Sequence, residues 1–248
     1  MRRNGRSAAS VTAVLFALVL AFGAGPARAA DLADFLAETG AAYEHYRQTM
    51  FYLRTGNPAV AEFDLQLMRD KWAALEETYA ADPPAPFSAD PGFAATVSAV
   101  ARAIDGGIAN VATEDAEAAR AALAPIRGLL GDLRRRNGLY TLSDCVDEFS
   151  ASAEALWVYR HAPPDFADPE AVNGLRRAAA VAGFLLGRCR AMAAPAHGAA
   201  EEFQALFDGA KASASSLWPA IDAGDTQRVI NILREFRSFD QMIYLRYG

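Results

Sequence analysis

The sequence lacks the common motifs of catalysis and nucleotide binding. It contains no HExxH, no GxxxxGK[ST] loop, no GxSxG and no GxGxxG. The usual patterns for zinc-dependent hydrolysis, phosphate binding, acyl transfer and dinucleotide binding are therefore missing. The serines and acids of "DEFSASAE" have no histidine placed to complete a catalytic triad. We expect that this protein is not an enzyme.

Cysteine and histidine are scarce. There are two cysteines and three histidines in 248 residues. Cys145 is followed by Val-Asp-Glu, so the C-x-x-C-H pattern that attaches c-type haem is absent. The separation of Cys145 from Cys189 matches no zinc-binding spacing either. Covalent haem and a cysteine-based zinc site are thus excluded.

Residues 1–29 have the pattern of an export signal. A short segment with three arginines precedes the apolar run "VTAVLFALVLAFG", and Ala27–Ala29 forms a small-x-small cleavage site. The apolar run is too short for a typical membrane span. We expect cleavage after Ala29 and a periplasmic, exported chain without a membrane span. An uncleaved anchor is the alternative.

The charge is acidic. The chain has 24 basic and 30 acidic residues, a net charge of −6. Removing residues 1–29 takes away four arginines and no acids, which makes the net charge −10. Nucleic acids and anionic lipid surfaces attract basic faces instead. The composition therefore argues against nucleic acid. It does not identify the partner, and a periplasmic protein and a small ligand are both open.

Helix-forming residues dominate the remaining sequence, and no long stretch alternates in the manner of a strand. Breaks rich in proline and glycine, such as "TGNP" and "ADPPAPFSADPG", separate the helical segments. We place expected N-caps at Thr113 and Ser143. The predicted helices span approximately Leu32–Arg54, Pro58–Tyr79, Phe93–Val111, Glu114–Asn137, Ser143–His161, Glu170–Met192, Ala199–Trp218 and Thr226–Tyr247.

The helical segments repeat along the chain. "YEHYRQTMFYLR" at 43–54 aligns with "FSASAEALWVYR" at 149–160, with aromatic residues over aromatic residues. Two amphipathic helices can always be aligned by eye, but the matching order of helices and breaks favours an internal duplication. The prediction is an all-α fold of two up-down antiparallel four-helix bundles in tandem, residues 30–138 and 139–248. The three tryptophans are expected to fill the bundle cores: Trp72, Trp157 and Trp218.

Two longer stretches carry a family resemblance. "FYLRTGNPAVAEFDLQLMRDKWAAL" with its proline-rich second loop, and "WPAIDAGDTQRVINILREFRSFDQMIYLRYG", resemble cytochrome b562 and the related cytochrome c-prime bundles. The resemblance covers nearly the whole mature chain as two copies. It implies four-helix bundles and a role in binding or electron transfer.

The resemblance also implies where haem ligands would stand. The family uses a methionine on the first helix and a histidine near the end of the fourth. The histidine position holds Tyr244 in the second copy and falls near Arg134 in the first, while the methionine position falls near Ala42 and Glu148. None of these is a family ligand. Tyr244 remains the candidate haem ligand, because tyrosine ligates ferric haem in other folds; the alternative is a packed aromatic.

Other side chains could hold a metal or an anion. His45 or Met50 could form a copper site together with Met68, since copper prefers soft ligands. Alternatively, Met50 and Met68 fill gaps in the core and His45 lies on the surface. The run Arg134–Arg136 ends a predicted helix, where it complements the helix dipole or contacts an anionic ligand.

We expect Cys145 and Cys189 to form a disulfide. They lie near opposite ends of two consecutive helices that should form an antiparallel hairpin around "APPDFADP". Their axial heights above that turn are roughly 24 and 30 Å, a mismatch of about one helical turn. An exported location permits oxidation. The alternative is two buried free thiols.

These observations predict a periplasmic, non-catalytic binding or accessory protein. Its fold would be that of a haem-less cytochrome b562 or c-prime, without a required cofactor, and it could hold a metal ion, a small ligand or a protein partner. The alternative is a periplasmic electron-transfer protein that binds haem noncovalently through unorthodox ligands.

Overall fold

The structure, a computed structural model, describes residues 27–248, except for the side chains of residues 27–31, 196 and 197. All regular elements in this range are helices, as the all-α prediction requires, and no strand occurs within it. The expected export signal lies outside the described residues apart from its last three, which begin α1. In the part of the chain described, no helix is long and apolar enough to cross a membrane.

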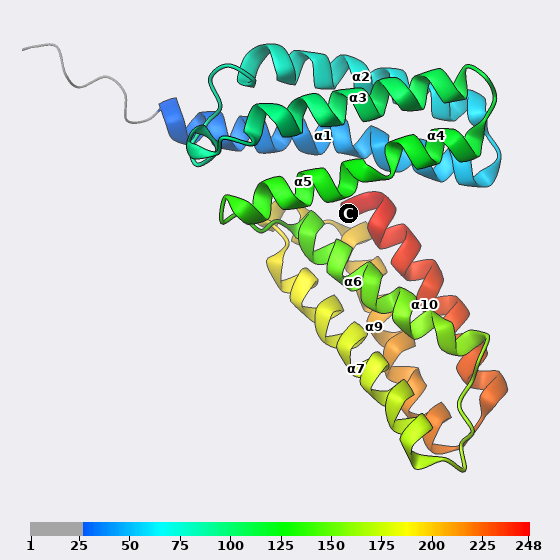
Figure 1. Cartoon of the computed structure of the whole chain (residues 1–248). Helices are drawn as coiled ribbons and strands as arrows, with labels where there is room; N and C mark the ends of the chain where they lie inside the picture. The colour runs from blue at the N-terminus through cyan, green and yellow to red at the C-terminus, as the bar shows by residue number, and fades with distance from the viewer. Residues whose placement is uncertain (1–26) are drawn as a thin grey trace, which may run out of the picture.

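The first helix group occupies the N-terminal half of the described chain. α1 packs against α2, α2 against α3, and α3 against both α4 and α5, while α4 returns to contact α1. Figure 1 shows these helices lying side by side, with α5 on the face that meets the rest of the molecule. Their bounds are α1 Ala27–Thr55, α2 Pro58–Tyr79, α3 Phe93–Val111, α4 Ala116–Leu123 and α5 Pro125–Arg136, with a short 3-10 turn at Phe87–Ala89.

The second helix group follows after a short connection. α6 packs against α7, α7 against α9, α9 against α10, and α10 against α6, which closes the group. The group projects at an angle from the first one (Figure 1). Its elements are α6 Leu142–Trp157, a 3-10 turn Val158–Arg160, α7 Pro169–Met192, the single turn α8 Pro195–Gly198, α9 Glu201–Asp222 and α10 Thr226–Tyr247.

Each group buries its own hydrophobic cluster. The first cluster runs from Phe35 to Leu133, and the second from Cys145 to Ile243. Between the groups, α1 contacts α10, and the C-terminal end of α10 lies beside α5 (Figure 1). That residues 30–138 and 139–248 are duplicated bundles stays a prediction.

Proline and glycine residues correctly predicted several helix ends, but the helix break at one proline was not predicted. α2 and α3 have the predicted bounds, Pro58–Tyr79 and Phe93–Val111. The predicted fourth helix is instead divided into α4 and α5 at Pro125. Proline has no N–H to donate, and its ring clashes with the carbonyl four residues earlier, so the helix breaks there. After the break, α5 packs against α3 and lies on the face of the first group that meets the second helix group (Figure 1).

The predicted N-caps were each two residues away from the observed ones. Asp115, not Thr113, caps α4 and accepts a hydrogen bond from the backbone N–H of Ala118. Thr141, not Ser143, caps α6, and it forms a capping box with Asp144. A capping box satisfies two backbone donors reciprocally. The third residue after the cap is Asp144, where the usual capping box has Glu or Gln. The box was therefore not recognised in the sequence.

The end of α9 also differs from the prediction. The helix passes through Pro219 and ends at Asp222, instead of ending near Trp218. Ala220 and Ile221 are buried, so continuing the helix keeps two more apolar residues in the second cluster. Trp218 itself is 39% exposed and does not fill the core. Trp72 does, with its indole N–H donating to the carbonyl of Val97 at 3.1 Å.

The two cysteines lie together in the structure. The Cα atoms of Cys145 on α6 and Cys189 on α7 are 5.4 Å apart and the sulfurs are bonded, a Cα separation typical of disulfides. The difference in axial height expected from the sequence thus does not keep the two cysteines apart. The bridge ties α6 to α7 near the start of α6.

Candidate functional site

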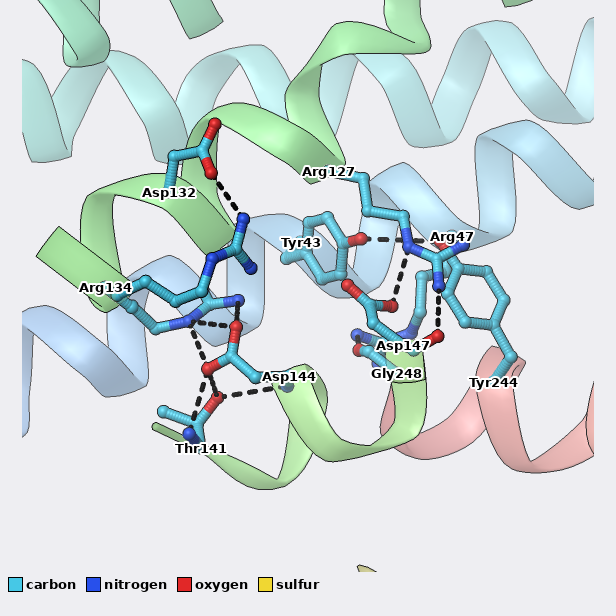
Figure 2. A network of polar contacts seen from close by, with 11 residues as sticks. Tyr43, Arg47, Arg127, Asp132, Arg134, Thr141, Asp144, Asp147, Tyr244 and Gly248 are labelled. Atoms are coloured by element: carbon cyan, nitrogen blue, oxygen red, sulfur yellow. Dashed lines mark hydrogen bonds and ion pairs between the residues drawn. The ribbon is translucent and has the colours of Figure 1, made fainter. Parts of the chain in front are cut away.

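Tyrosines from both helix groups meet where α1 contacts α10. The hydroxyl oxygens of Tyr43 and Tyr244 are 3.4 Å apart (Figure 2). Tyr46 lies one helical turn after Tyr43, and the two rings stack with centroids 4.9 Å apart. Burial raises the pKa of all three phenols. They are therefore neutral at physiological pH, and the hydroxyls of Tyr43 and Tyr244 can hydrogen-bond to each other.

Arg47 on α1 holds the end of α10. Its Nε donates to the carbonyl of Leu245 at 2.9 Å, its Nη2 to that of Arg246 at 3.2 Å, and its Nη1 to that of Gly248. The last carbonyls of a helix carry partial negative charge and have no partner within the helix. Burial lowers the pKa of Arg47. This arginine thereby fixes one wall of the site across the two groups.

Arg127 on α5 meets Asp147 on α6. Its Nε lies 2.7 Å from Oδ1 of Asp147, and its Nη2 donates to the Asp147 backbone carbonyl at 3.2 Å. The same guanidinium lies 4.8 Å from the centroid of the Tyr244 ring, in cation–π range. Burial would lower the pKa of Arg127, but Asp147 and Tyr244 outweigh it and raise that pKa. Burial also raises the pKa of Asp147, against the opposing effect of Arg127.

A second arginine–aspartate pair joins the same two helices. Arg134 donates to Asp144 through Nε and Nη2 at 2.7–3.0 Å. Asp144 also accepts from the backbone N–H and the hydroxyl of Thr141, at 2.9 and 2.8 Å (Figure 2). Burial would raise the pKa of Asp144, but these hydrogen bonds outweigh it and lower that pKa. Because both side chains are buried, this pair is structural.

A cleft of about 540 Å³ opens between α1, α4, α5, α6 and α10 beside these contacts. Five arginines line it, against two carboxylates: Arg47, Arg54, Arg120, Arg127 and Arg237 against Glu154 and Asp240. Arg237 pairs with Glu154 at 2.5 Å and with Asp240 at 3.0 Å. Burial raises the pKa of Asp240, although the Ser150 hydroxyl, which donates to it at 2.7 Å, opposes the rise.

The three predicted copper ligands have different surroundings. His45 lies 3.0 Å from Asp64 through its Nδ1. Met68 is fully buried in the first cluster, and Met50 lines the cleft, which neither His45 nor Met68 does. In the described part of the chain, no cluster of three His, Cys, Asp or Glu side chains could hold a metal ion. Methionine is not among these ligand types, so the copper site at His45, Met50 and Met68 stays a prediction.

Of two other predicted positions, only one lies at the cleft. Tyr244 lines it, so the residue predicted at the haem-ligand position faces a space open to a ligand. From the run Arg134–Arg136, Arg134 turns inward to Asp144, and Arg136 pairs with Asp90 at 2.7 Å. That run serves the fold and does not reach the cleft.

Sequence reasoning did not identify most of the cleft residues. Ser150, Ala151 and Glu154 line it from α6, and their spacing of three and four places them on one helix face. Asp147 continues the same stripe one turn earlier. This polar stripe on a helix that also carries an apolar face was the available signal. The arginines that oppose it are scattered over several helices, so no sequence spacing links them.

No protein-family model matches the chain, and no curated protein or solved structure shows significant similarity to it. The resemblance to cytochrome b562 and the c-prime bundles thus stays a prediction made from the sequence.

Proposed function

We propose that this chain is an exported, periplasmic, non-catalytic binding protein whose ligand site is the cleft between α1, α4, α5, α6 and α10. The observation that carries the proposal is the cleft itself: about 540 Å³, with guanidiniums from four different helices on its walls. Small-molecule sites are commonly clefts of about 300–1,000 Å³ with a few convergent polar groups.

The walls of the cleft are held before any ligand arrives. Arg47 fastens α10 to α1, and Arg127 fastens α5 to α6 through Asp147. A preformed site loses little conformational entropy on binding. The Cys145–Cys189 bridge supports an oxidising compartment, since disulfides persist there. Both features suit a protein that captures a small ligand outside the cytoplasm.

A cleft-filling substitution tests the proposal. Ala151 is an exposed alanine of α6 that lines the cleft, so Ala151→Trp should fill it without disturbing the core. Binding of 8-anilinonaphthalene-1-sulfonate and of its uncharged parent 1-anilinonaphthalene is followed by fluorescence titration. We expect Ala151→Trp to weaken both probes at least tenfold. The matched control is Ala180→Trp on α7, also exposed and outside the cleft.

Unchanged binding of both probes in Ala151→Trp would contradict a ligand site in this cleft. The visible spectrum of protein purified from the periplasm tests the haem-binding alternative. A Soret band would replace the proposed function with noncovalent haem binding and electron transfer. Elemental analysis of the same sample detects copper or iron.

A further inference from the structure

The cleft concentrates positive charge on an acidic protein. The whole chain carries a net charge of −6, yet the cleft has five arginines against two carboxylates. Like charges that converge on one space repel each other, and more strongly where protein excludes part of the solvent. An anion in the cleft would relieve that repulsion.

Three of the five arginines already bind other groups of the protein. Arg47 binds backbone carbonyls at the end of α10, Arg127 binds Asp147, and Arg237 binds Glu154 and Asp240. Each of these contacts joins two helices that form the cleft or steadies one of them. These arginines maintain the walls, and most of their charge is balanced by the protein.

The other two arginines have no such partners. Arg54 lies in the last turn of α1 and Arg120 on α4, and the two helices contact each other. Within the described residues, neither guanidinium has a hydrogen bond or an ion pair; Arg54 only lies 5.7 Å from the ring centroid of Phe51. Both side chains are exposed. Each offers five N–H donors to a molecule in the cleft.

Apart from Arg47, apolar side chains cover the rest of the α1 wall. Tyr46, Met50 and Arg54 are spaced four residues apart, so they form one stripe along α1. At 1.5 Å per residue, the stripe runs about 12 Å from the tyrosine to the arginine. Tyr244 and Leu245 extend the apolar surface from α10. The cleft therefore has a cationic end at Arg54 and an aromatic, aliphatic body towards Tyr46.

We infer, on the basis of the proposed binding function, that the ligand is a small organic anion. Its carboxylate, sulfonate or phosphate group lies between Arg54 and Arg120, and its apolar or aromatic body lies against Tyr46 and Met50. A bare inorganic anion would leave the apolar wall unused. A neutral apolar ligand would leave both guanidiniums unpaired. Guanidinium groups bind such oxyanions in bidentate fashion.

The two probes named above form a matched pair for this inference, since they differ only in the sulfonate. We expect the full-length protein to bind 8-anilinonaphthalene-1-sulfonate at least tenfold more tightly than 1-anilinonaphthalene. Arg54→Gln/Arg120→Gln should weaken the sulfonate about tenfold or more, because charge-assisted hydrogen bonds are lost. Binding of the neutral probe should stay unchanged.

The control variant is Arg102→Gln/Arg228→Gln. It removes the same charge from two exposed arginines of α3 and α10 that do not line the cleft. Its affinity for the sulfonate should stay within twofold of the unsubstituted protein. Because all four arginines are exposed, both double variants should unfold at the same urea concentration as the parent.

The outcomes separate this inference from the proposed function. Equal affinity for the two probes, or equal weakening in both double variants, would overturn the anion assignment. If Ala151→Trp still abolished binding in that case, the cleft would remain the ligand site for another class of ligand. If Ala151→Trp left both probes bound, the proposed function and the inference would fail together.

Discussion

Two arginine–aspartate pairs join α5 to α6, and the pKa of the aspartate is shifted in opposite directions in the two pairs. Asp144 accepts hydrogen bonds from Arg134 and from both the backbone and the hydroxyl of Thr141. Asp147 is paired with Arg127 alone. The pKa of Asp144 is lowered despite burial, while burial raises the pKa of Asp147.

The difference shows that pairing with one cation does not offset the free-energy cost of removing a carboxylate from water. Removing a carboxylate from water costs several kcal/mol in effect, and the cost is offset only when its lone pairs are satisfied. The Thr141 capping box supplies those extra donors to Asp144. Asp147 lies beside the cleft without them. Both pairs hold α5 to α6, but only the pair far from the cleft has a carboxylate that accepts hydrogen bonds from several donors.

The largest effect is expected from removing the Cys145–Cys189 disulfide. Cys145 lies on α6 between the two aspartates. Replacing both cysteines by alanine should lower the free energy of unfolding by about 4 kcal/mol, because a loop of about 45 residues is released in the unfolded chain. Urea unfolding of the double variant measures the loss. Probe binding in the cleft should survive, since the bridge joins α6 to α7 and not to α5.

Thiol titration of the unreduced, denatured protein provides the check on that prediction. No reactive thiol is expected. Two reactive thiols per chain would show that Cys145 and Cys189 are reduced, and the stability difference would then have another origin.

The next largest effect is expected at the well-satisfied pair. Asp144→Ala should lower the free energy of unfolding by about 3 kcal/mol, because it leaves the buried guanidinium of Arg134 without its partner. The double variant Arg134→Met/Asp144→Leu should recover most of the loss, since apolar side chains need no partner. An Asp144→Ala loss below about 1 kcal/mol would contradict the structural role assigned to this pair.

A smaller effect is expected at the pair beside the cleft. Asp147→Asn should change the free energy of unfolding by less than about 1 kcal/mol, because a partly exposed ion pair contributes little net stability. The substitution is matched to Asp144→Asn on the same helix, which should cost more. Urea unfolding of the two variants in parallel decides between them. Equal losses would show that the capping box adds nothing.

The smallest effect is a pH dependence of opposite sign at the two aspartates. The lowered pKa of Asp144 stabilises the protein above the unfolded value of about 3.9, and this contribution is lost as the pH falls through the folded pKa. The raised pKa of Asp147 favours the protonated native state, so its contribution is lost as the pH rises. The free energy of unfolding, measured between pH 3 and 7, should therefore fall less steeply towards acid in Asp144→Asn than in the unsubstituted protein. In Asp147→Asn it should fall more steeply.

Sequence reasoning succeeded where the signal was local. The bounds of α2 and α3 followed from Pro58, Gly56 and the proline-rich loop after Tyr79, because proline and glycine restrict the backbone wherever they stand. The pairing of Cys145 with Cys189 followed from two consecutive helices joined by a short connection. These inferences needed only the helical rise and the conformational preferences of a few residues.

The candidate site could be predicted only in fragments. Tyr244 was predicted as a haem ligand and Met50 as a copper ligand. Both line the cleft, but the helix packing that places them there could not be predicted from the sequence. The cleft is built from five helices that are distant in sequence. Arg54 and Arg120 resemble any other surface arginines until α1 and α4 pack against each other.

The sequence by itself thus determined the helical character, most helix ends and the cysteine pair, because each depends on residues close together along the chain. Only the tertiary structure decided which of the charged side chains are satisfied and which are not. The break at Pro125 turns α5 towards α6, and this orientation selects Arg134 for Asp144 and Arg127 for Asp147. The energy of a charge depends on the donors and the solvent around it, and these are assembled only when distant helices meet.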